Sequence, residues 1–225
     1  MSTRGRIIEE ALRLFAERGY NATSVAEIEA AAGLSPGAGG LYRHFRSKYE
    51  VLAAAVADRA SRNEITLDVA QTEPIEVRLA AMCRAGLGKM DEERMLAQVF
   101  FRDLSQFPDL VAVVTEGLLQ PMFDALTEWF ACQPEYLDAQ VDWAGVGSVL
   151  GGSIINYRLI EYTTAEAPGR VATDRFVSAW IRLALGLLPP GVCGDGWVEE
   201  PVEQPRQPDG GADDERDAGD LVEAR

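Results

Sequence analysis

Apolar residues recur at helical spacing along most of the chain. In residues 3–18, for example, Ile8, Leu12 and Phe15 fall on one face, as expected for a helix with one buried side. Alternation of apolar and polar residues, which would indicate strands, is absent. The pattern therefore predicts an all-α fold.

The same periodicity divides the chain into successive helical segments. The first covers residues 3–18, the second begins at Thr23 and Ser24, and the third begins at Ser35 and Pro36. Pro121 lies inside a helical pattern and predicts a kink or break there. The remaining helices are expected at about 47–64, 74–90, 92–107, 109–132, 138–163 and 171–188.

Local signals set the ends of the first helices. Ser2 or Thr3 can cap the first helix, and Gly19 ends it. The spacing Ser24-x-x-Glu27 fits a capping box, in which both side chains bind free backbone N–H groups. Gly33 ends this second helix, because glycine adopts a left-handed conformation at little cost.

Two short helices joined by a Gly-Leu-Ser turn span about residues 22–46. This is the layout of a helix-turn-helix, which places one helix in the DNA major groove. We therefore predict a DNA-binding domain at 1–50, whose last helix extends to about residue 64. A larger helical domain is expected at 51–188. The tail at 189–225 is rich in Pro, Gly and acidic residues and is expected to be disordered.

The charge distribution supports this division. The chain carries a formal net charge of −15, but residues 1–50 hold seven basic and six acidic residues. Residues 51–190 and 191–225 each carry a net charge of −8. Only the N-terminal part would therefore not repel phosphates, and tight binding is expected to need two paired chains.

Polar and small residues around the turn are the candidate DNA contacts. Arg43 can bind a guanine edge through two hydrogen bonds, and Leu41 can touch a thymine methyl group. Gly39 and Gly40 would let the backbone approach closely. The full predicted set is Thr23, Ser24, Ser35, Gly39, Gly40, Leu41, Tyr42, Arg43, His44 and Lys48. The alternative roles are helix capping for Thr23 and Ser24, a place in the core for Tyr42, and simple solvation for Arg43 and Lys48.

The motif Gly-Leu-Ser followed by Leu-Tyr-Arg-His-Phe-Arg-Ser-Lys, after Ala-Leu-Arg-Leu-Phe-Ala-Glu-Arg-Gly-Tyr, resembles the TetR family of transcriptional regulators. The resemblance covers about residues 4–58. It implies an all-helical homodimer in which a small molecule bound by the larger domain releases DNA. It also implies that Tyr42 and Lys48 contact phosphates.

Two features depart from the family pattern. The segment 36–40 carries two additional residues between Gly33 and Tyr42, and it is rich in glycine. Glu29 stands where the two helices approach closely and Ala or Gly is usual. We expect these departures to compensate for one another, since small residues on one helix make room for a longer side chain on the other.

The larger domain offers apolar and aromatic residues for an effector cavity, with ordinary core packing as the alternative. The predicted pocket comprises Met82, Phe100, Phe101, Met122, Phe123, Trp129 and Tyr157. An apolar or aromatic ligand would suit it. The glycine-rich helix at 138–163 and the helix at 171–188 are predicted to form a homodimer interface through Gly147, Gly151, Ile155 and Trp180, with close packing inside the chain as the alternative.

Other functions are less well supported by the residues. The three cysteines are too far apart for a metal site, and His44 has no evident catalytic partner. We find no catalytic set, metal cluster, phosphate loop or cofactor motif. No signal peptide and no apolar run of membrane-spanning length is evident, so a cytoplasmic protein without membrane contact is expected. A helical ligand-binding or interaction protein that has lost DNA recognition remains the alternative function.

Overall fold

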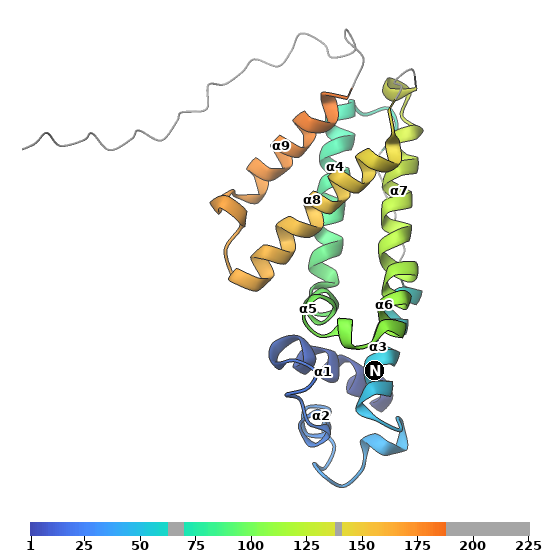
Figure 1. Ribbon diagram of the computed structural model, residues 1–225, viewed down its shortest axis with the longest axis vertical. Helices are drawn as coiled ribbons and strands as arrows, with labels where there is room; N and C mark the ends of the chain where they lie inside the picture. The colour runs from blue at the N-terminus through green and yellow to red at the C-terminus, as the bar shows by residue number, and fades with distance from the viewer. Residues whose placement is uncertain (63–69, 138–140, 188–225) are drawn as a thin grey trace, which may run out of the picture. The chain divides into compact units, whose positions relative to one another are not determined.

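The computed structural model describes residues 1–62, 70–137 and 141–187, and these residues contain no strand. The N-terminal helices are α1 (Thr3–Arg18), α2 (Val25–Ala31) and α3 (Lys48–Ser61), with the short 3₁₀ turn η1 (Leu41–Arg43) between α2 and α3 (Figure 1). The later elements are α4 (Ile75–Glu92), α5 (Arg94–Arg102), η2 (Leu104–Gln106), α6 (Pro108–Val114), η3 (Thr115–Leu119), α7 (Gln120–Ala131), η4 (Pro134–Tyr136), α8 (Trp143–Thr164), η5 (Pro168–Arg170) and α9 (Thr173–Leu185). The all-α expectation is confirmed.

Two apolar cores hold these helices together. The first combines the N-terminal helices with later elements, since Ile7, Phe15 and Leu52 pack in one cluster with Val99 of α5 and Leu118 of η3. The predicted domain boundary at residue 50 therefore does not separate two cores. Burial of side chains from both parts couples the N-terminal helices to α5, α6 and η3.

The second core lies among α4, α7, α8 and α9. Its largest buried side chains include Trp180, Phe130 and Tyr136. The two polar aromatic side chains bind backbone carbonyl groups. Trp180 Nε1 donates to Leu150 O at 3.1 Å, and the Tyr136 hydroxyl donates to Ala184 O at 2.8 Å. Pairing of this kind lets a polar aromatic group be buried without a desolvation penalty.

The predicted caps of the first two helices are confirmed. Ser2 caps α1 by accepting the Gly5 N–H at 3.1 Å, and α1 ends at Gly19. The capping box of α2 is complete, because Ser24 Oγ accepts the Glu27 N–H at 3.2 Å and the Glu27 carboxylate accepts the Ser24 N–H at 2.8 Å. Both interactions satisfy amide groups that have no partner inside the helix.

The helix expected from Ser35 to about residue 46 does not form. Residues 34–40 are turns, and only Leu41–Arg43 are helical, as the 3₁₀ turn η1. Gly37 and Gly39 both have φ of +74°, a left-handed conformation that interrupts an α-helix and that glycine adopts most readily. The element that follows the turn is therefore a glycine-rich loop with a short helical end.

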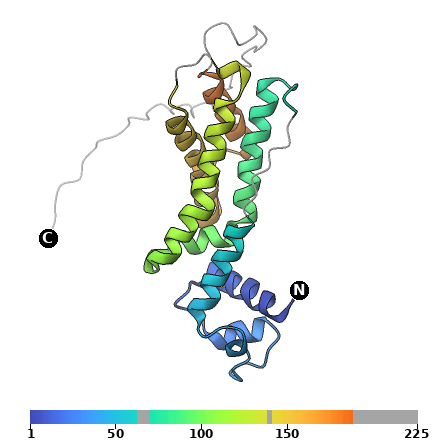
Figure 2. The ribbon, with the colours of Figure 1, turned by 90° about the vertical axis from the view of Figure 1, so that its right-hand side faces the viewer.

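The helix expected at 109–132 continues through Pro121 without breaking. Elements α6, η3 and α7 form one long, bent helix in Figure 2, and η3 within it is a π-helical turn. A π-turn shifts the hydrogen-bond register locally, so the carbonyl groups before Pro121 need not pair as in a regular α-helix.

By length and composition alone, Pro108–Ala131 is also apolar enough to cross a membrane, with a mean hydropathy of 1.2 over an 18-residue window. The sequence did not predict a span here because polar residues interrupt the apolar stretch. This is weak evidence for membrane insertion, since core helices meet the same criterion. Leu110 and Val114 of this helix lie in the first core, and Phe130 lies in the second.

The predicted disordered tail at 189–225 lies outside the described residues. The same is true of Cys193, and of residues 138–140 at the start of one expected helix. Of the remaining cysteines, Cys83 is buried and Cys132 is exposed, and both are free thiols.

Candidate DNA-binding surface and effector pocket

Glu29 organises the loop that replaces the expected helix. Its side chain is fully buried, and its carboxylate accepts the Gly37 N–H at 2.7 Å and the Leu41 N–H at 2.9 Å. The expected compensation between Glu29 and the glycine-rich segment is therefore present, but through hydrogen bonds. The carboxylate occupies the position between α2 and the loop and holds the backbone on both sides of Gly39.

This arrangement presents three consecutive side chains to solvent. Tyr42 is 58% exposed, and Arg43 and His44 are also exposed. Leu41 is fully buried in the first core, so its predicted contact with a thymine methyl group is wrong in this conformation. Leu41 is the apolar residue of η1 and packs into the core, whereas the polar residues that follow it face the solvent.

Lys48 has a structural partner that the sequence did not reveal. Its Nζ donates to Tyr20 O and to Thr23 O, each at 2.7 Å, and lies 4.3 Å from the centre of the Tyr20 ring. Partial burial lowers the pKa of Lys48. Lys48 lies at the N-terminal end of α3, where the helix dipole disfavours a positive charge, and these carbonyl groups stabilise it there. The resemblance had implied a DNA phosphate as the partner of this lysine.

Thr23 is also held inside the protein. It is almost fully buried, and its hydroxyl donates to Gly19 O at 2.8 Å and lies 3.3 Å from Leu14 O. Its predicted side-chain contact with DNA is therefore wrong in this conformation. Ser24, by contrast, is exposed and caps α2, Ser35 is exposed, and Gly39 and Gly40 are partly exposed.

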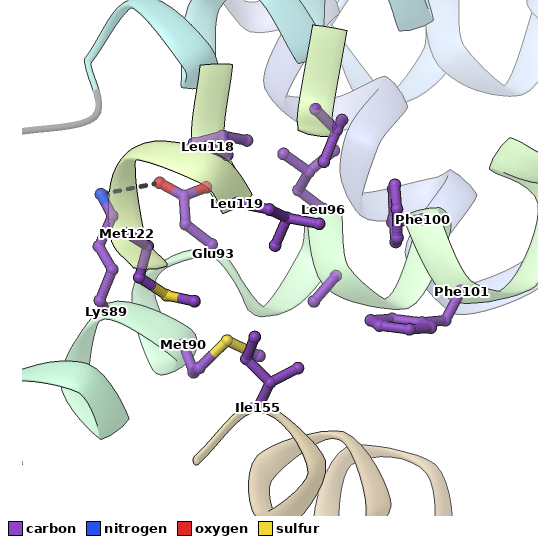
Figure 3. Close-up of a pocket in the computed structure, with 12 residues that line it drawn as sticks. Lys89, Met90, Glu93, Leu96, Phe100, Phe101, Leu118, Leu119, Met122 and Ile155 are labelled. Carbon is purple, nitrogen blue, oxygen red and sulfur yellow. Dashed lines mark hydrogen bonds and ion pairs between the residues drawn. The ribbon is translucent and has the colours of Figure 1, made fainter. Parts of the chain in front are cut away.

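An apolar cavity of about 70 Å³ lies where α4 meets α5. In Figure 3, Lys89 and Glu93 occupy one end and Phe100 and Phe101 the other. Twelve residues line it: Lys89, Met90, Glu93, Leu96, Ala97, Phe100, Phe101, Val114, Leu118, Leu119, Met122 and Ile155. Glu93 lies between α4 and α5, and the others come from α4, α5, α6, η3, α7 and α8. Because Leu96 belongs to the first core and Met90 to the second, the cavity lies beside both cores.

The cavity includes only part of the predicted pocket. Phe100, Phe101 and Met122 line it, whereas Met82, Trp129 and Tyr157 belong to the second core. Phe123 packs against α8. Tyr157 is nearly buried and its hydroxyl donates to Val171 O at 2.8 Å. These four residues are excluded because the packing of α4 and α7 against α8 and α9 already encloses them.

The sequence offered little signal for the residues that were missed. Lys89 and Glu93 are four positions apart at a helix end, which is the ordinary spacing of a solvated ion pair. Leu118 and Leu119 lie in an apolar run that also fits a core. The strongly amphipathic pattern of α5 was the one available indication, because Leu96 and Phe100 recur on one face at helical spacing.

Helix α5 connects this cavity to the N-terminal helices. Leu96 and Phe100 line the cavity, and the end of the same helix binds α1. Arg102 donates to the carbonyl oxygens of Phe15 and Ala16. Arg102 thus binds the last turn of α1, where a cation interacts favourably with the helix dipole.

Asp103 completes this contact. One of its oxygens accepts from the Tyr20 N–H at 3.1 Å and from Arg102 Nε at 3.1 Å. Besides pairing with each other, Arg102 and Asp103 thus bind backbone groups at and just beyond the end of α1.

The residues predicted for the dimer interface are engaged inside the chain. A Cβ at Gly147 would lie 2.7 Å from Thr127 Oγ1, and one at Gly151 would lie 2.9 Å from Phe123 Cε1, so these glycines allow α8 to approach α7. Trp180 is buried and Ile155 lines the cavity. The four positions are corrected to intrachain packing, the alternative that the sequence had left open.

The N-terminal region thus has α2, a turn at Gly33 and then a mostly exposed segment, residues 34–44, in place of the second helix of a helix-turn-helix. We call residues 34–44 the reading segment. Residues 7–55 match the family model described as bacterial regulatory proteins, tetR family. The match covers most of α1, then α2, η1 and the first half of α3, so the resemblance to the tetR family lies in this N-terminal region.

Two kinds of protein are similar to this chain. The HTH-type transcriptional regulator YerO of Bacillus subtilis is 33% identical over 119 residues, which are 51% of this chain and 36% of YerO. The match therefore spans about a third of that relative's length. The fatty acid degradation regulator FadR of Bacillus halodurans has the same fold, with a TM-score of 0.61 and 20% identity over 82% of this chain and 95% of FadR.

A second solved structure is FadR of Bacillus subtilis in complex with stearoyl-CoA. It has a TM-score of 0.59 and 18% identity, and the match covers 82% of this chain and 99% of that protein. Similarity at this level establishes a common fold.

Proposed function

We propose that the protein is a ligand-responsive transcriptional repressor of the cytoplasm that acts as a homodimer on a palindromic operator. The observation that carries this proposal is the exposed triplet Tyr42, Arg43 and His44 in the reading segment, within the region that resembles the tetR family. An apolar cavity lined in part by α5, the helix that binds α1, supports control by a small molecule.

The triplet suits DNA in its chemistry. Arg43 offers a planar group that can donate two hydrogen bonds to a guanine edge, and the Tyr42 hydroxyl can donate to a phosphate. The reading segment would enter the major groove as a loop held by Glu29, not as a long helix. Close approach of its backbone is favoured by Gly39 and Gly40, which carry no side chains.

The effector is proposed to act through the walls of the cavity. Helix α5 lines the cavity and binds α1 through Arg102. The π-turn η3 also lines it, and a Cβ at Gly117 in this turn would lie 2.8 Å from Ala60 Cβ in α3. A ligand that bound more tightly to a widened cavity would shift α1 and α3 and thereby reduce affinity for DNA.

Selection of bound sequences from a random duplex pool tests DNA recognition. We expect enrichment of a partial palindrome whose half-sites lie about one helical turn apart. Arg43→Ala is expected to weaken binding by about 1–3 kcal/mol and to relax the preference at one position of each half-site. Arg170→Ala removes the same charge from an 88% exposed side chain outside the N-terminal helices and serves as the matched control.

The second candidate function is a helical ligand-binding or interaction protein without DNA recognition. The observation that favours it is the loss of the reading α-helix, of which only the three-residue turn η1 remains. A pool that shows no enriched sequence, together with equal binding by Arg43→Ala and the unmodified protein, would support this second function.

A further inference from the structure

We propose that the cavity selects a ligand with one protonated amine on an apolar body, and that the ammonium group donates to Glu93 Oε2. This inference rests on the proposed function, since it names the chemistry of the effector for the same cavity. It starts from a single atom, because Glu93 is one of the residues that line the cavity and one oxygen of its carboxylate accepts no hydrogen bond. This oxygen is buried behind the apolar surface, so the ligand must widen the cavity to reach it.

The two oxygens of Glu93 have different surroundings. Oε1 accepts from Lys89 Nζ at 3.4 Å. Oε2 is buried and accepts no hydrogen bond, and Arg59 Nε, at 4.0 Å from it, is too far away to donate one. A buried acceptor left unpaired is unfavourable, so a ligand that supplied a donor there would gain an interaction that the free protein lacks.

The charges around Glu93 favour a cation as that donor. Arg59 Nη2 binds the Glu9 carboxylate at 2.9 and 3.1 Å, and Lys89 is shared between Glu92 at 3.8 Å and Glu93 at 3.4 Å. Each of the two basic side chains near Glu93 therefore also binds another carboxylate, Glu9 or the solvent-exposed Glu92. A cationic ligand group beside Glu93 would be attracted to its carboxylate, whereas an anionic group would be repelled by it.

The rest of the wall suits an apolar body. Beyond Lys89 and Glu93, the lining consists of aliphatic, methionine and aromatic side chains. Phe100 and Phe101 lie at the end opposite the Lys89–Glu93 pair (Figure 3), so a ligand with its amine at Glu93 would extend toward the two rings. Met90 and Met122 are unbranched and can repack to widen a cavity of about 70 Å³.

Three matched probes test the proposal: hexylammonium, 1-hexanol and hexanoate. They share one apolar chain and differ in the head group. Binding to the full chain without DNA is measured by calorimetry at pH 7. We expect hexylammonium to bind about tenfold more tightly than 1-hexanol, because a hydrogen bond to a charged group is stronger than a neutral one. Hexanoate is expected to bind most weakly.

Two variants locate the effect. Glu93→Gln is expected to weaken hexylammonium binding about tenfold and to leave 1-hexanol nearly unchanged. Glu92→Gln makes the same substitution at a side chain that is 72% exposed and not part of the cavity wall, and it should retain the preference for the amine. If Glu93→Gln does not fold, the order of the three probes on the unmodified protein decides the question.

Several results would overturn the inference: equal affinity for the three probes, tightest binding of hexanoate, no binding of any probe, or an unchanged preference in folded Glu93→Gln. DNA release is measured separately. A protein that binds hexylammonium through Glu93 but does not bind DNA would contradict the proposed function and leave the ligand class standing.

Discussion

Single residues with buried polar atoms decide the form of the reading segment. Glu29 is fully buried, and none of the ion pairs among the described residues includes it. Its carboxylate is stabilised by the N–H groups of Gly37 and Leu41, and it stabilises in turn a loop whose glycines would otherwise have many conformations. Lys48 and Thr23 act in the same way on the loop between α1 and α2.

Replacing Glu29 with alanine should loosen this loop. Glu29→Ala is expected to lower the free energy of unfolding by about 2 kcal/mol, because two amide groups lose a charged acceptor. Amide exchange at Gly37 and Leu41 should become faster. Glu29→Gln keeps one acceptor oxygen and should lose less stability. Glu17→Ala, at an exposed ion pair with Arg13, should change stability by less than about 1 kcal/mol.

An unchanged exchange rate at Leu41 in Glu29→Ala would show that the loop is held by packing alone. Chemical denaturation monitored by circular dichroism gives the free energies, and hydrogen exchange gives the local effect.

At the scale of elements, the π-turn η3 joins the cavity to α3. Leu118 and Leu119 line the cavity, and Gly117 in the same turn lies against Ala60 of α3. The turn precedes Pro121, which cannot donate a backbone hydrogen bond. A short segment with altered hydrogen bonding therefore stands between the proposed effector and a helix of the proposed DNA-binding region.

The contact at Gly117 leaves no space for a methyl group. Gly117→Ala is expected to lower the free energy of unfolding by about 1–2 kcal/mol, because the new Cβ would lie 2.8 Å from Ala60 Cβ. Gly88→Ala is the matched control, since the position is helical and has no atom within 4 Å of the added Cβ. It should raise stability by up to about 1 kcal/mol.

Urea unfolding of both variants provides the comparison. If Gly117→Ala were as stabilising as Gly88→Ala, η3 would not be in tight contact with α3 in solution, and the proposed route from the cavity would lose its support.

At the scale of the whole molecule, the exposed apolar side chains on α8 and α9 indicate where two chains would meet. Val149 is 70% exposed and Leu183 is 66% exposed, although both belong to helices whose other faces form the second core. Exposed apolar residues on neighbouring helices are favourable in a homodimer, where they are removed from water. We therefore propose that the same two helices form the dimer interface, with different residues on them.

Charges at these positions should separate the dimer. Val149→Glu and Leu183→Glu are each expected to convert a dimer to monomers at micromolar concentration and to reduce operator affinity at least tenfold, because two half-sites would no longer be bound together. Analytical ultracentrifugation measures the mass. Leu137→Glu, at a side chain that is 68% exposed, is the matched control and should remain dimeric. A dimer that persists in both α8 and α9 variants would place the interface elsewhere.

The sequence by itself determined the features that depend on neighbouring residues. The helical periodicity, the Ser24–Glu27 capping box and the ends at Gly19 and Gly33 were all predictable, because each depends on groups within a few positions. The exposure of Tyr42 and Arg43 agreed with their polar character. The unusual placement of Glu29 was also visible.

Only the tertiary structure decided which face of each segment is used. The inward position of Leu41, the partners of Lys48 and the intrachain role of Gly147 depend on contacts between segments far apart in sequence. The cavity is likewise a space left among several helices, and an amphipathic pattern marks an apolar face without saying whether it meets a core, a ligand or another chain. Local chemistry set the elements, and long-range packing assigned their surfaces.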